Sequence, residues 1–214
     1  MSRGLGDVYK RQASDFGVPQ RRNRLFIVGN RNGIDFEFPK EFDYSVSVDE
    51  AISDLPVLGN GEIQMKGEYT VPFEQASPYA QLMRKKSKAP TQNIVSRNKD
   101  YVVERYKYIG QGENWSSIPD RLMENYADKK RCHSGIYKRL IGGKPSVVIS
   151  NYRKSMLIHP HQDRGLSVRE AARLQSFPDH FIFEGPVSYV QQQIGNAVPP
   201  LLAKAVMKKI LTYK

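Results

Sequence analysis

The residues best suited to chemistry lie near the start of the chain, in the short basic run Gln20-Arg21-Arg22-Asn23-Arg24. Gln20, Arg22 and Arg24 alternate along this run, so in an extended chain their side chains point to the same face. One amide and two guanidinium groups on one face can bind a carbonyl, a carboxylate or a phosphate. The same pattern also fits a solvated basic strand edge, and the spacing alone leaves both interpretations open.

A second segment with chemistry-bearing side chains contains Arg169 and Arg173, four residues apart. Ser167 and Glu170 have the spacing of a capping box, which predicts that a helix begins here. Residues four apart on a helix share a face, so we expect the two arginines to lie together. A helix of this kind mainly packs, and packing is the interpretation that we prefer.

A third segment, Gln193-Ile194-Gly195-Asn196-Ala197-Val198-Pro199-Pro200, combines turn residues with residues that start a helix. Gly195 and Asn196 predict a tight turn just before a helix N-terminus, where backbone N–H groups are available to a ligand. An ordinary turn without a ligand is the simpler alternative.

Short predicted elements position these segments. The apolar run at 25–29 follows the arginines and predicts a buried strand, and Val147-Val148-Ile149 predicts another. Ser47 and Glu50 have capping-box spacing and predict a short helix. A C-terminal helix is predicted from about residue 200, because apolar residues at four-residue spacing give it a buried face: Leu202, Val206 and Ile210.

The composition excludes several classes of protein. The chain has 214 residues, with 33 Lys and Arg against 22 Asp and Glu, and its formal net charge of +11 favours a polyanionic partner. Apolar residues make up 39%, enough for a folded core, and no run approaches the ~18 apolar residues that a membrane span needs. The one cysteine, Cys132, excludes an intramolecular disulfide and a multi-cysteine metal site. We therefore expect no bound metal and a reducing, cytoplasmic location.

Together, and in this order, the three segments resemble the eighth, ninth and tenth sequence motifs of the DNA (cytosine-5) methyltransferases. The matching residues are Gln20-x-Arg22-x-Arg24 after Gly17-Val18-Pro19, then Arg169-Glu170-Ala171-Ala172-Arg173-Leu174-Gln175-x-Phe177-Pro178, then Gln193 to Pro200. Residues 109–115 and 137–140 look like that family's variable region. The resemblance spans about residues 13–205.

The resemblance implies an α/β fold, an incomplete Rossmann-like sheet of the S-adenosylmethionine-dependent methyltransferase type with an inserted small, strand-rich target-recognition domain. The first and third segments are then expected to meet in space, and an apolar face near Phe26, Leu202 and Val206 to lack its neighbours. The expected divisions are a non-native leader at 1–12, the C-terminal part of the catalytic domain at 13–39, the target-recognition domain at 40–157, a region bracing it at 158–192, and a return to the catalytic domain with the C-terminal helix at 193–214.

The activity implied by the resemblance is transfer of a methyl group from S-adenosylmethionine to carbon 5 of a cytosine flipped out of double-stranded DNA. Arg24 would hold the O2 carbonyl of that base, with Arg22 supporting the same pocket. Asn196 and Ala197 would lie against S-adenosylmethionine, while Gln20 orders its turn. Basic residues of the recognition region would contact DNA phosphates: Lys85, Lys86, Lys129, Lys130 and Arg131.

The family's earlier motifs are missing from this sequence, which has no glycine-rich cofactor loop, no Pro-Cys-Gln and no Glu-Asn-Val. Cys132 follows the arginine segment, the wrong order for the family's nucleophile, so we expect the chain alone to be inactive. Three interpretations stay open: the C-terminal part of a one-chain enzyme with a restriction-modification or regulatory role, the recognition subunit of a split methyltransferase, and a stand-alone sequence-specific DNA-binding module. The first two require an N-terminal catalytic part, in the same chain or in a separate one.

Overall fold

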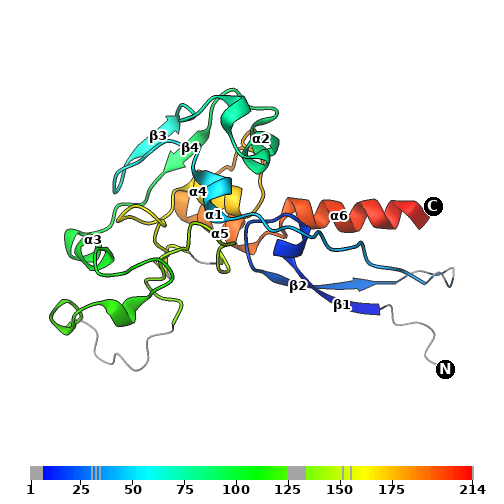
Figure 1. Ribbon diagram of the computed structural model, residues 1–214, viewed down its shortest axis with the longest axis horizontal. Helices are drawn as coiled ribbons and strands as arrows, with labels where there is room; N and C mark the ends of the chain where they lie inside the picture. The colour runs from blue at the N-terminus through cyan, green and yellow to red at the C-terminus, as the bar shows by residue number, and fades with distance from the viewer. Residues whose placement is uncertain are drawn as a thin grey trace.

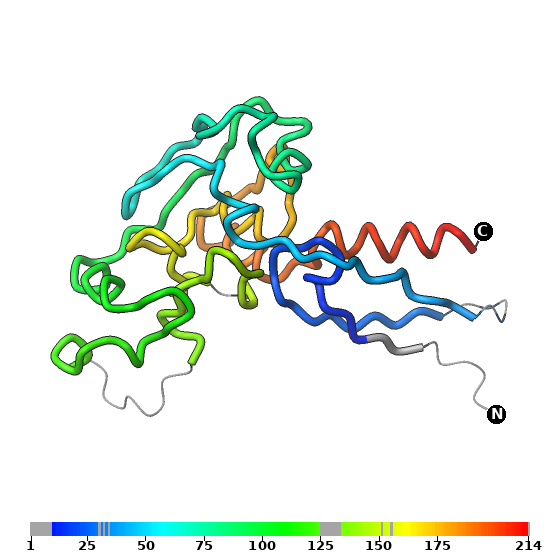
Figure 2. The backbone as a smooth tube through the Cα atoms, in the orientation of Figure 1, coloured from blue at the N-terminus to red at the C-terminus, as the bar shows by residue number. Residues whose placement is uncertain are grey.

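Residues from both ends of the sequence form one lobe of the molecule. In Figure 1, β1 (Asp7–Gln12) and β2 (Asn23–Val28) lie beside α6 (Pro200–Ile210), and the other labelled elements gather in a second, larger lobe. Figure 2 shows that the chain leaves the small lobe after β2, runs through the larger lobe and returns for α6. The computed structural model describes residues 7–29, 31, 33, 35–124, 134–150, 152–154 and 156–213.

The larger lobe is built around α4 (Val168–Leu174), whose seven residues are all buried. The preferred packing interpretation of this helix is therefore confirmed. α1 and α5 pack against it, together with one edge of a short sheet. The remaining elements of this lobe are α1 (Val48–Ile52), β3 (Ile63–Lys66), α2 (Pro78–Arg84), β4 (Thr91–Ile94), α3 (Asp100–Tyr106) and α5 (Val187–Asn196).

Both sheets are antiparallel pairs of short strands, β1 with β2 and β3 with β4. β1 falls within residues 1–12, so part of the expected leader forms a strand. Within the described ranges, parallel pairing is confined to isolated bridges, one of which joins Gln20 to Ser146. The fold is therefore α/β with small sheets, and the described part of 40–157, expected to be strand-rich, contains only β3 and β4 as strands.

The small lobe has a core of its own between α6 and a 3-10 turn at Ala13–Phe16. Leu202 and Val206 are buried in this core, and Phe26 packs on it from β2. The exposed apolar face expected at these three residues is therefore wrong. Ile210, predicted to share the buried face of α6, is exposed at the end of that helix.

The outer face of β2 carries the exposed apolar residues instead. Side chains alternate along a strand, so Phe26 points to the core while Leu25 and Ile27 point away from it. These two side chains are 62% and 68% exposed. The small sheet therefore packs on the core with one face and exposes an apolar strip on the other. The strand predicted at 25–29 is present as β2, but its predicted burial is wrong, because none of the residues of β2 is buried.

The strand predicted at 147–149 is wrong. The Ile149 N–H donates to Gln20 Oε1 at 3.1 Å, and the Ile149 carbonyl accepts from Arg22 Nη1 at 2.9 Å. Both backbone groups are thus bound to side chains, so a strand ladder cannot continue through this residue.

Both predicted capping boxes are present. In each, a serine hydroxyl accepts from the N–H of a glutamate three residues on, and the glutamate carboxylate accepts from the serine N–H. Ser47 and Glu50 begin α1 in this way, and Ser167 and Glu170 begin α4.

In the part of the chain that is described, no helix combines the length and the apolar character needed to cross a lipid bilayer.

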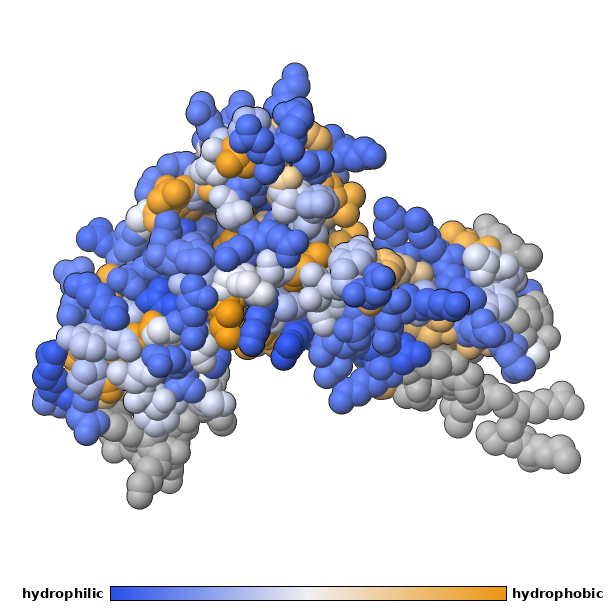
Figure 3. Space-filling view, viewed as in Figure 1, coloured by the Kyte–Doolittle hydropathy of each residue, from blue (hydrophilic) through white to orange (hydrophobic). Residues whose placement is uncertain are grey.

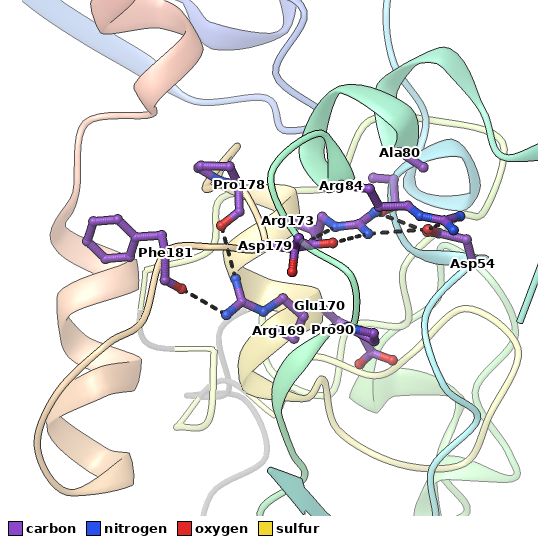
Figure 4. A network of polar contacts seen from close by, with 12 residues as sticks. Asp54, Ala80, Arg84, Pro90, Arg169, Glu170, Arg173, Pro178, Asp179 and Phe181 are labelled. Atoms are coloured by element: carbon purple, nitrogen blue, oxygen red, sulfur yellow. Dashed lines mark hydrogen bonds and ion pairs between the residues drawn. The ribbon is translucent and has the colours of Figure 1, made fainter. Parts of the chain in front are cut away.

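A buried ion network joins α4 to α2 through Asp54, which lies just after α1 (Figure 4). Arg173 Nε lies 2.5 Å from Asp179 Oδ1, and Arg173 Nη1 lies 3.0 Å from Asp54 Oδ1. Arg84 Nη1 lies 3.4 Å from Asp54 Oδ2, and Arg84 Cζ lies 3.8 Å from the centroid of the Tyr69 ring. Burial raises the pKa of Asp179, but the hydrogen bond and charge of Arg173 outweigh it and hold that pKa below its usual value. The carboxylate of Asp179 therefore stays ionised inside the fold.

Arg169, one turn earlier on α4, donates to backbone carbonyls rather than to acids. Its guanidinium contacts Pro178 O at 3.3 Å and Phe181 O at 2.9 Å (Figure 4). It also contacts Thr91 O at 2.9 Å. The two arginines of α4 therefore hold β4, α1 and the segment after α4 in fixed positions.

Removing Arg173 should leave Asp54 and Asp179 buried with too little positive charge. We expect Arg173→Met to lower the free energy of unfolding by about 3–5 kcal/mol, the usual cost of breaking a buried ion pair. Urea unfolding followed by circular dichroism measures this. The control is Lys107→Ala, which removes an exposed contact of 2.7 Å to Glu104 and should change stability little. Equal midpoints for the two variants would contradict the prediction.

A second buried charge group lies at the start of α4. Arg164 donates to both carboxylate oxygens of Glu170, at 2.9 and 2.7 Å, and His159 Nε2 lies 3.7 Å from Glu170 Oε1. Burial raises the pKa of Glu170, but the charge and hydrogen bonds of Arg164 outweigh it and lower that pKa to about 2. Burial lowers the pKa of His159 to about 4 although Glu170 acts in the opposite direction, so the imidazole is neutral near pH 7.

The free energy of unfolding should depend on pH through His159. Its pKa is about 4 in the folded chain and about 6.5 in an unfolded one, so the unfolded state takes up the proton first as the pH falls. The free energy of unfolding is therefore highest above about pH 6.5, and it falls by about 3 kcal/mol in total as the pH decreases to about 4. Urea unfolding at about pH 7 and about pH 4.5 measures the loss. His159→Gln should reduce it, and an equal loss in that variant would refute the assignment.

Candidate functional site

The three predicted segments meet at one place in the structure. Arg22 Nη2 donates to the Gly195 carbonyl at 2.6 Å across 173 residues of sequence, and Arg22 Nη1 donates to the Ile149 carbonyl at 2.9 Å. Only 4% of Arg22 is exposed. The expectation that the first and third segments lie together is therefore confirmed.

Two fully buried glutamines complete this meeting point. Gln20 Nε2 donates to Gln175 Oε1 at 2.7 Å and to the Leu174 carbonyl at 3.3 Å. Gln175 Nε2 then donates to the carbonyls of Ile194 and Ala197, at 2.8 and 3.1 Å. We call Gln20, Arg22 and Gln175 the polar knot, because each one binds backbone from another part of the chain.

The side chain of Gln20 binds Ile149 and Leu174 rather than its own turn, so its ordering of that turn stays a prediction. The sequence did not single out Gln175 as an individual site residue. A glutamine directly after a helix that is otherwise packed on all sides is the available signal, because a buried amide needs partners.

The two predicted pocket arginines differ in their surroundings. The guanidinium of Arg22 is occupied by backbone carbonyls, whereas Arg24 is half-buried on the same face of β2 as Phe26. Arg24 Nη1 donates to the carbonyl of its neighbour Asn23 at 3.0 Å. Burial lowers the pKa of Arg24, but a guanidinium keeps its charge at neutral pH. Of the two, Arg24 is the arginine whose surface is open to a ligand.

The tight turn predicted at Gly195 and Asn196 is wrong, because both residues belong to the last turn of α5. A Cβ atom on Gly195 would lie 1.6 Å from the carbonyl oxygen of Ser150. The glycine is therefore needed for close backbone approach rather than for turning. Asn196 is exposed beside this contact, and Ala197 is half-buried.

The free N–H groups predicted at the start of α6 are also wrong. Pro199 and Pro200 carry no N–H, and the N–H of Leu201 donates to Ser176 Oγ at 3.1 Å. The start of this helix is therefore closed by the protein itself.

The predicted DNA-contacting lysines lie elsewhere. Lys85 and Lys86 are exposed at the C-terminal end of α2, which lies at the top of Figure 1, away from β2. Arg84, at the start of the same basic stretch, is buried in the ion network and is no surface charge. The rest of the predicted set lies outside the described residues, as does Cys132: Lys129, Lys130 and Arg131.

The two segments that look like a variable region form one unit. The Gly112 N–H donates to the Arg139 carbonyl at 3.1 Å, and the Arg139 N–H donates to the Glu113 carbonyl at 3.1 Å. The guanidinium of Arg139 binds the carbonyls of Ile109 and Tyr106, at 2.5 and 2.7 Å. Residues 109–115 and 137–140 are therefore held together by one buried arginine.

The sequence of the chain is similar to those of known proteins. The model of the family "C-5 cytosine-specific DNA methylase" matches residues 11–212. The chain is 33% identical to the type II methyltransferase M.DdeI of Desulfomicrobium norvegicum, over 94% of this chain and 53% of that protein. It is 34% identical to the type II methyltransferase M1.HphI of Haemophilus parahaemolyticus, over 93% of this chain and 46% of that protein. The chain thus spans about half the length of these curated relatives.

The fold has a counterpart among solved structures. A crystal structure assigned as a DNA modification methyltransferase encoded within a prophage of E. coli superimposes with a TM-score of 0.68. The match covers 98% of this chain and 60% of that one, at 23% sequence identity. The likeness is one of fold.

A substitution that adds one methyl group to Gly195 tests its close contact with Ser150. Gly195→Ala should lower the free energy of unfolding by about 1–3 kcal/mol or more, because backbone atoms must move to admit the Cβ. Gly143→Ala is the matched control, since a Cβ there meets no atom within 4 Å. Urea unfolding compares the two variants. A Gly195→Ala protein as stable as the control would show that this approach is not required.

Proposed function

Because the chain belongs to the C-5 cytosine-specific DNA methylase family, we propose that it forms the DNA-recognition part and one side of the base and cofactor pockets of a cytosine-5 DNA methyltransferase. The whole enzyme would transfer a methyl group from S-adenosylmethionine to carbon 5 of a cytosine in double-stranded DNA. The polar knot carries this proposal, because it joins the three segments that resemble the family's motifs across up to 173 residues of sequence.

The small lobe supports a larger parent sheet. α6 covers one face of β2, while Leu25 and Ile27 leave the other face apolar and exposed. Sheets of α/β proteins generally carry helices on both faces. We propose that strands of the catalytic part, which carries the nucleophilic cysteine, add at an edge of this sheet to complete a Rossmann-like sheet and that other elements of that part cover its outer face, with residues 40–157 inserted as the recognition domain. That part is the N-terminal region of the same chain or a separate subunit.

Arg24 is the residue proposed to touch the target base. A cytosine flipped out of the duplex would place its O2 carbonyl against this guanidinium. Negative charge builds on the ring when a thiolate adds to carbon 6, and a fixed cation in a partly dry site stabilises it. Half-burial of Arg24 on β2 fits this role.

Arg22 is proposed to position that pocket rather than to touch the base. Its donors to the Gly195 and Ile149 carbonyls fix the start of β2 relative to α5. A guanidinium already bound to two carbonyls in the interior has little capacity left for a ligand. Arg22 would thus support the pocket by holding the backbone of Gly195 and Ile149 rather than by contact with the base.

S-adenosylmethionine supplies the methyl group when it is bound, and Asn196 and Ala197 are proposed to hold it. An exposed amide and a small half-buried side chain stand next to each other beside the polar knot. This pair fits one wall of a pocket for a ligand with both polar and apolar parts.

The shape of the molecule supports binding to a duplex. Figure 3 shows a concave outline between the two lobes, edged by hydrophilic residues with some hydrophobic ones among them. The formal net charge of +11 attracts the phosphate backbone, with Lys85, Lys86, Lys129, Lys130 and Arg131 as proposed contacts. Such contacts set affinity and its salt dependence, while residues 40–157 would read the sequence.

A stand-alone DNA-binding module is the alternative from another class. Such a module needs neither a partly exposed arginine, Arg24, beside a buried one, Arg22, nor the Gly195 contact next to Asn196. A long sequencing read upstream of the codon for Ala13 separates the remaining interpretations. A continuous frame with a Pro-Cys-Gln motif identifies a one-chain enzyme, and a separate frame carrying that motif identifies a split one.

In the enzyme completed with its catalytic part, Arg24→Ala should lower kcat/KM by the equivalent of about 2–4 kcal/mol, because it removes charge stabilisation made in the transition state. Transfer of radiolabelled methyl from S-adenosylmethionine to DNA measures this. Arg21→Ala is the control, since Arg21 is an exposed arginine in the same run. A fall in DNA affinity with unchanged turnover would count against the base-pocket role.

A further inference from the structure

We infer that Gln175 is a positioning residue for the proposed cofactor pocket, because it fixes the backbone on both sides of Asn196. Its two amide hydrogens point to the carbonyls of Ile194 and Ala197. This inference rests on the proposed function, since Asn196 and Ala197 are the residues assigned there to S-adenosylmethionine.

The orientation of the first amide in the knot follows from its partners. Gln20 Oε1 accepts from the Ile149 N–H at 3.1 Å and lies 3.4 Å from Arg22 Nη1. Both partners can only donate, so the oxygen of Gln20 must face them. Its amide nitrogen therefore faces Gln175 Oε1 and the Leu174 carbonyl, both of which accept.

The orientation of Gln175 follows in turn. Its oxygen accepts from Gln20, so its nitrogen must donate, and it meets the carbonyls of Ile194 and Ala197. A backbone carbonyl has no hydrogen to give, so neither end of this chain of hydrogen bonds can be reversed. Neither glutamine has exposed surface, and water cannot replace a lost partner.

These bonds determine how the chain leaves α5. The last carbonyls of a helix have no partner within it and must be satisfied from outside. Here Gln175 binds the carbonyls of Ile194 and Ala197, and Arg22 binds the carbonyl of Gly195. Asn196 lies between these fixed points and is itself exposed. Its backbone is thus held by the interior while its side chain faces outward.

A nearly isosteric substitution tests whether Gln175 must donate hydrogen bonds to these two carbonyls. Gln175→Glu keeps the size of the side chain but turns an oxygen towards two carbonyl oxygens. In the enzyme completed with its catalytic part, it should weaken binding of S-adenosylhomocysteine about tenfold or more. Specific DNA binding, measured in parallel, should change less than about threefold.

The matched control is Gln191→Glu, at a buried glutamine of α5, the helix whose end Gln175 binds. Gln191 Nε2 donates to Ser96 Oγ at 3.0 Å, and a hydroxyl can reverse its role and donate instead. Its effect on S-adenosylhomocysteine binding should stay within about threefold. Equal losses in both variants, or equal losses of cofactor and DNA affinity in Gln175→Glu, would mean general destabilisation and overturn the inference.

A second readout does not depend on activity. Hydrogen exchange of the Asn196, Ala197 and Val198 amides should speed up in Gln175→Glu and remain unchanged in Gln191→Glu. Unchanged exchange in Gln175→Glu would overturn the positioning role. Failure of the proposed function would appear differently, as an unsubstituted enzyme that binds neither S-adenosylhomocysteine nor cytosine-containing DNA.

Discussion

Hydrogen bonds from buried side chains to distant backbone carbonyls are the constraint on which the candidate site depends. Gln20, Arg22 and Gln175 lie in the interior and donate to Leu174, Ile149, Ile194, Gly195 and Ala197. Water does not reach these groups, so each lost bond leaves a carbonyl without a partner and costs about 1–3 kcal/mol. The segments from the start, middle and end of the chain are thereby held in one mutual orientation.

A second set of buried polar contacts fixes the larger lobe in the same manner. Arg173 binds the carboxylates of Asp54, just after α1, and of Asp179, in the segment after α4, while Arg169 binds carbonyls of β4 and of that segment. Apolar residues of similar size would fill the same space without such directional demands. Because α4 carries both arginines and continues directly into Gln175, the orientation of this helix sets the orientation of the polar knot.

Local signals predicted the parts of the fold that depend on neighbours in sequence. The capping boxes at Ser47 and Ser167, the strand after Arg24 and the helix from Pro200 all follow from residues within a few positions of each other. The errors at 147–149 and at Gly195 arose where contacts across more than a hundred residues, or between Gly195 and Ser150, decide the backbone. Residue type also could not tell Arg22 from Arg24, because their burial depends on what packs above them.

The close approach of Gly195 to Ser150 bears on where a chimera with a relative could be joined. Ile149 and Ser150 lie near the end of the proposed recognition region, yet their backbone fits a surface made by α5 and by Gln20 and Arg22. A chimera that grafts a foreign recognition region would need its downstream junction placed before residue 146, so that the host retains its own fitted backbone. The part of the proposed recognition region that could be exchanged is therefore smaller than a boundary at 157 suggests.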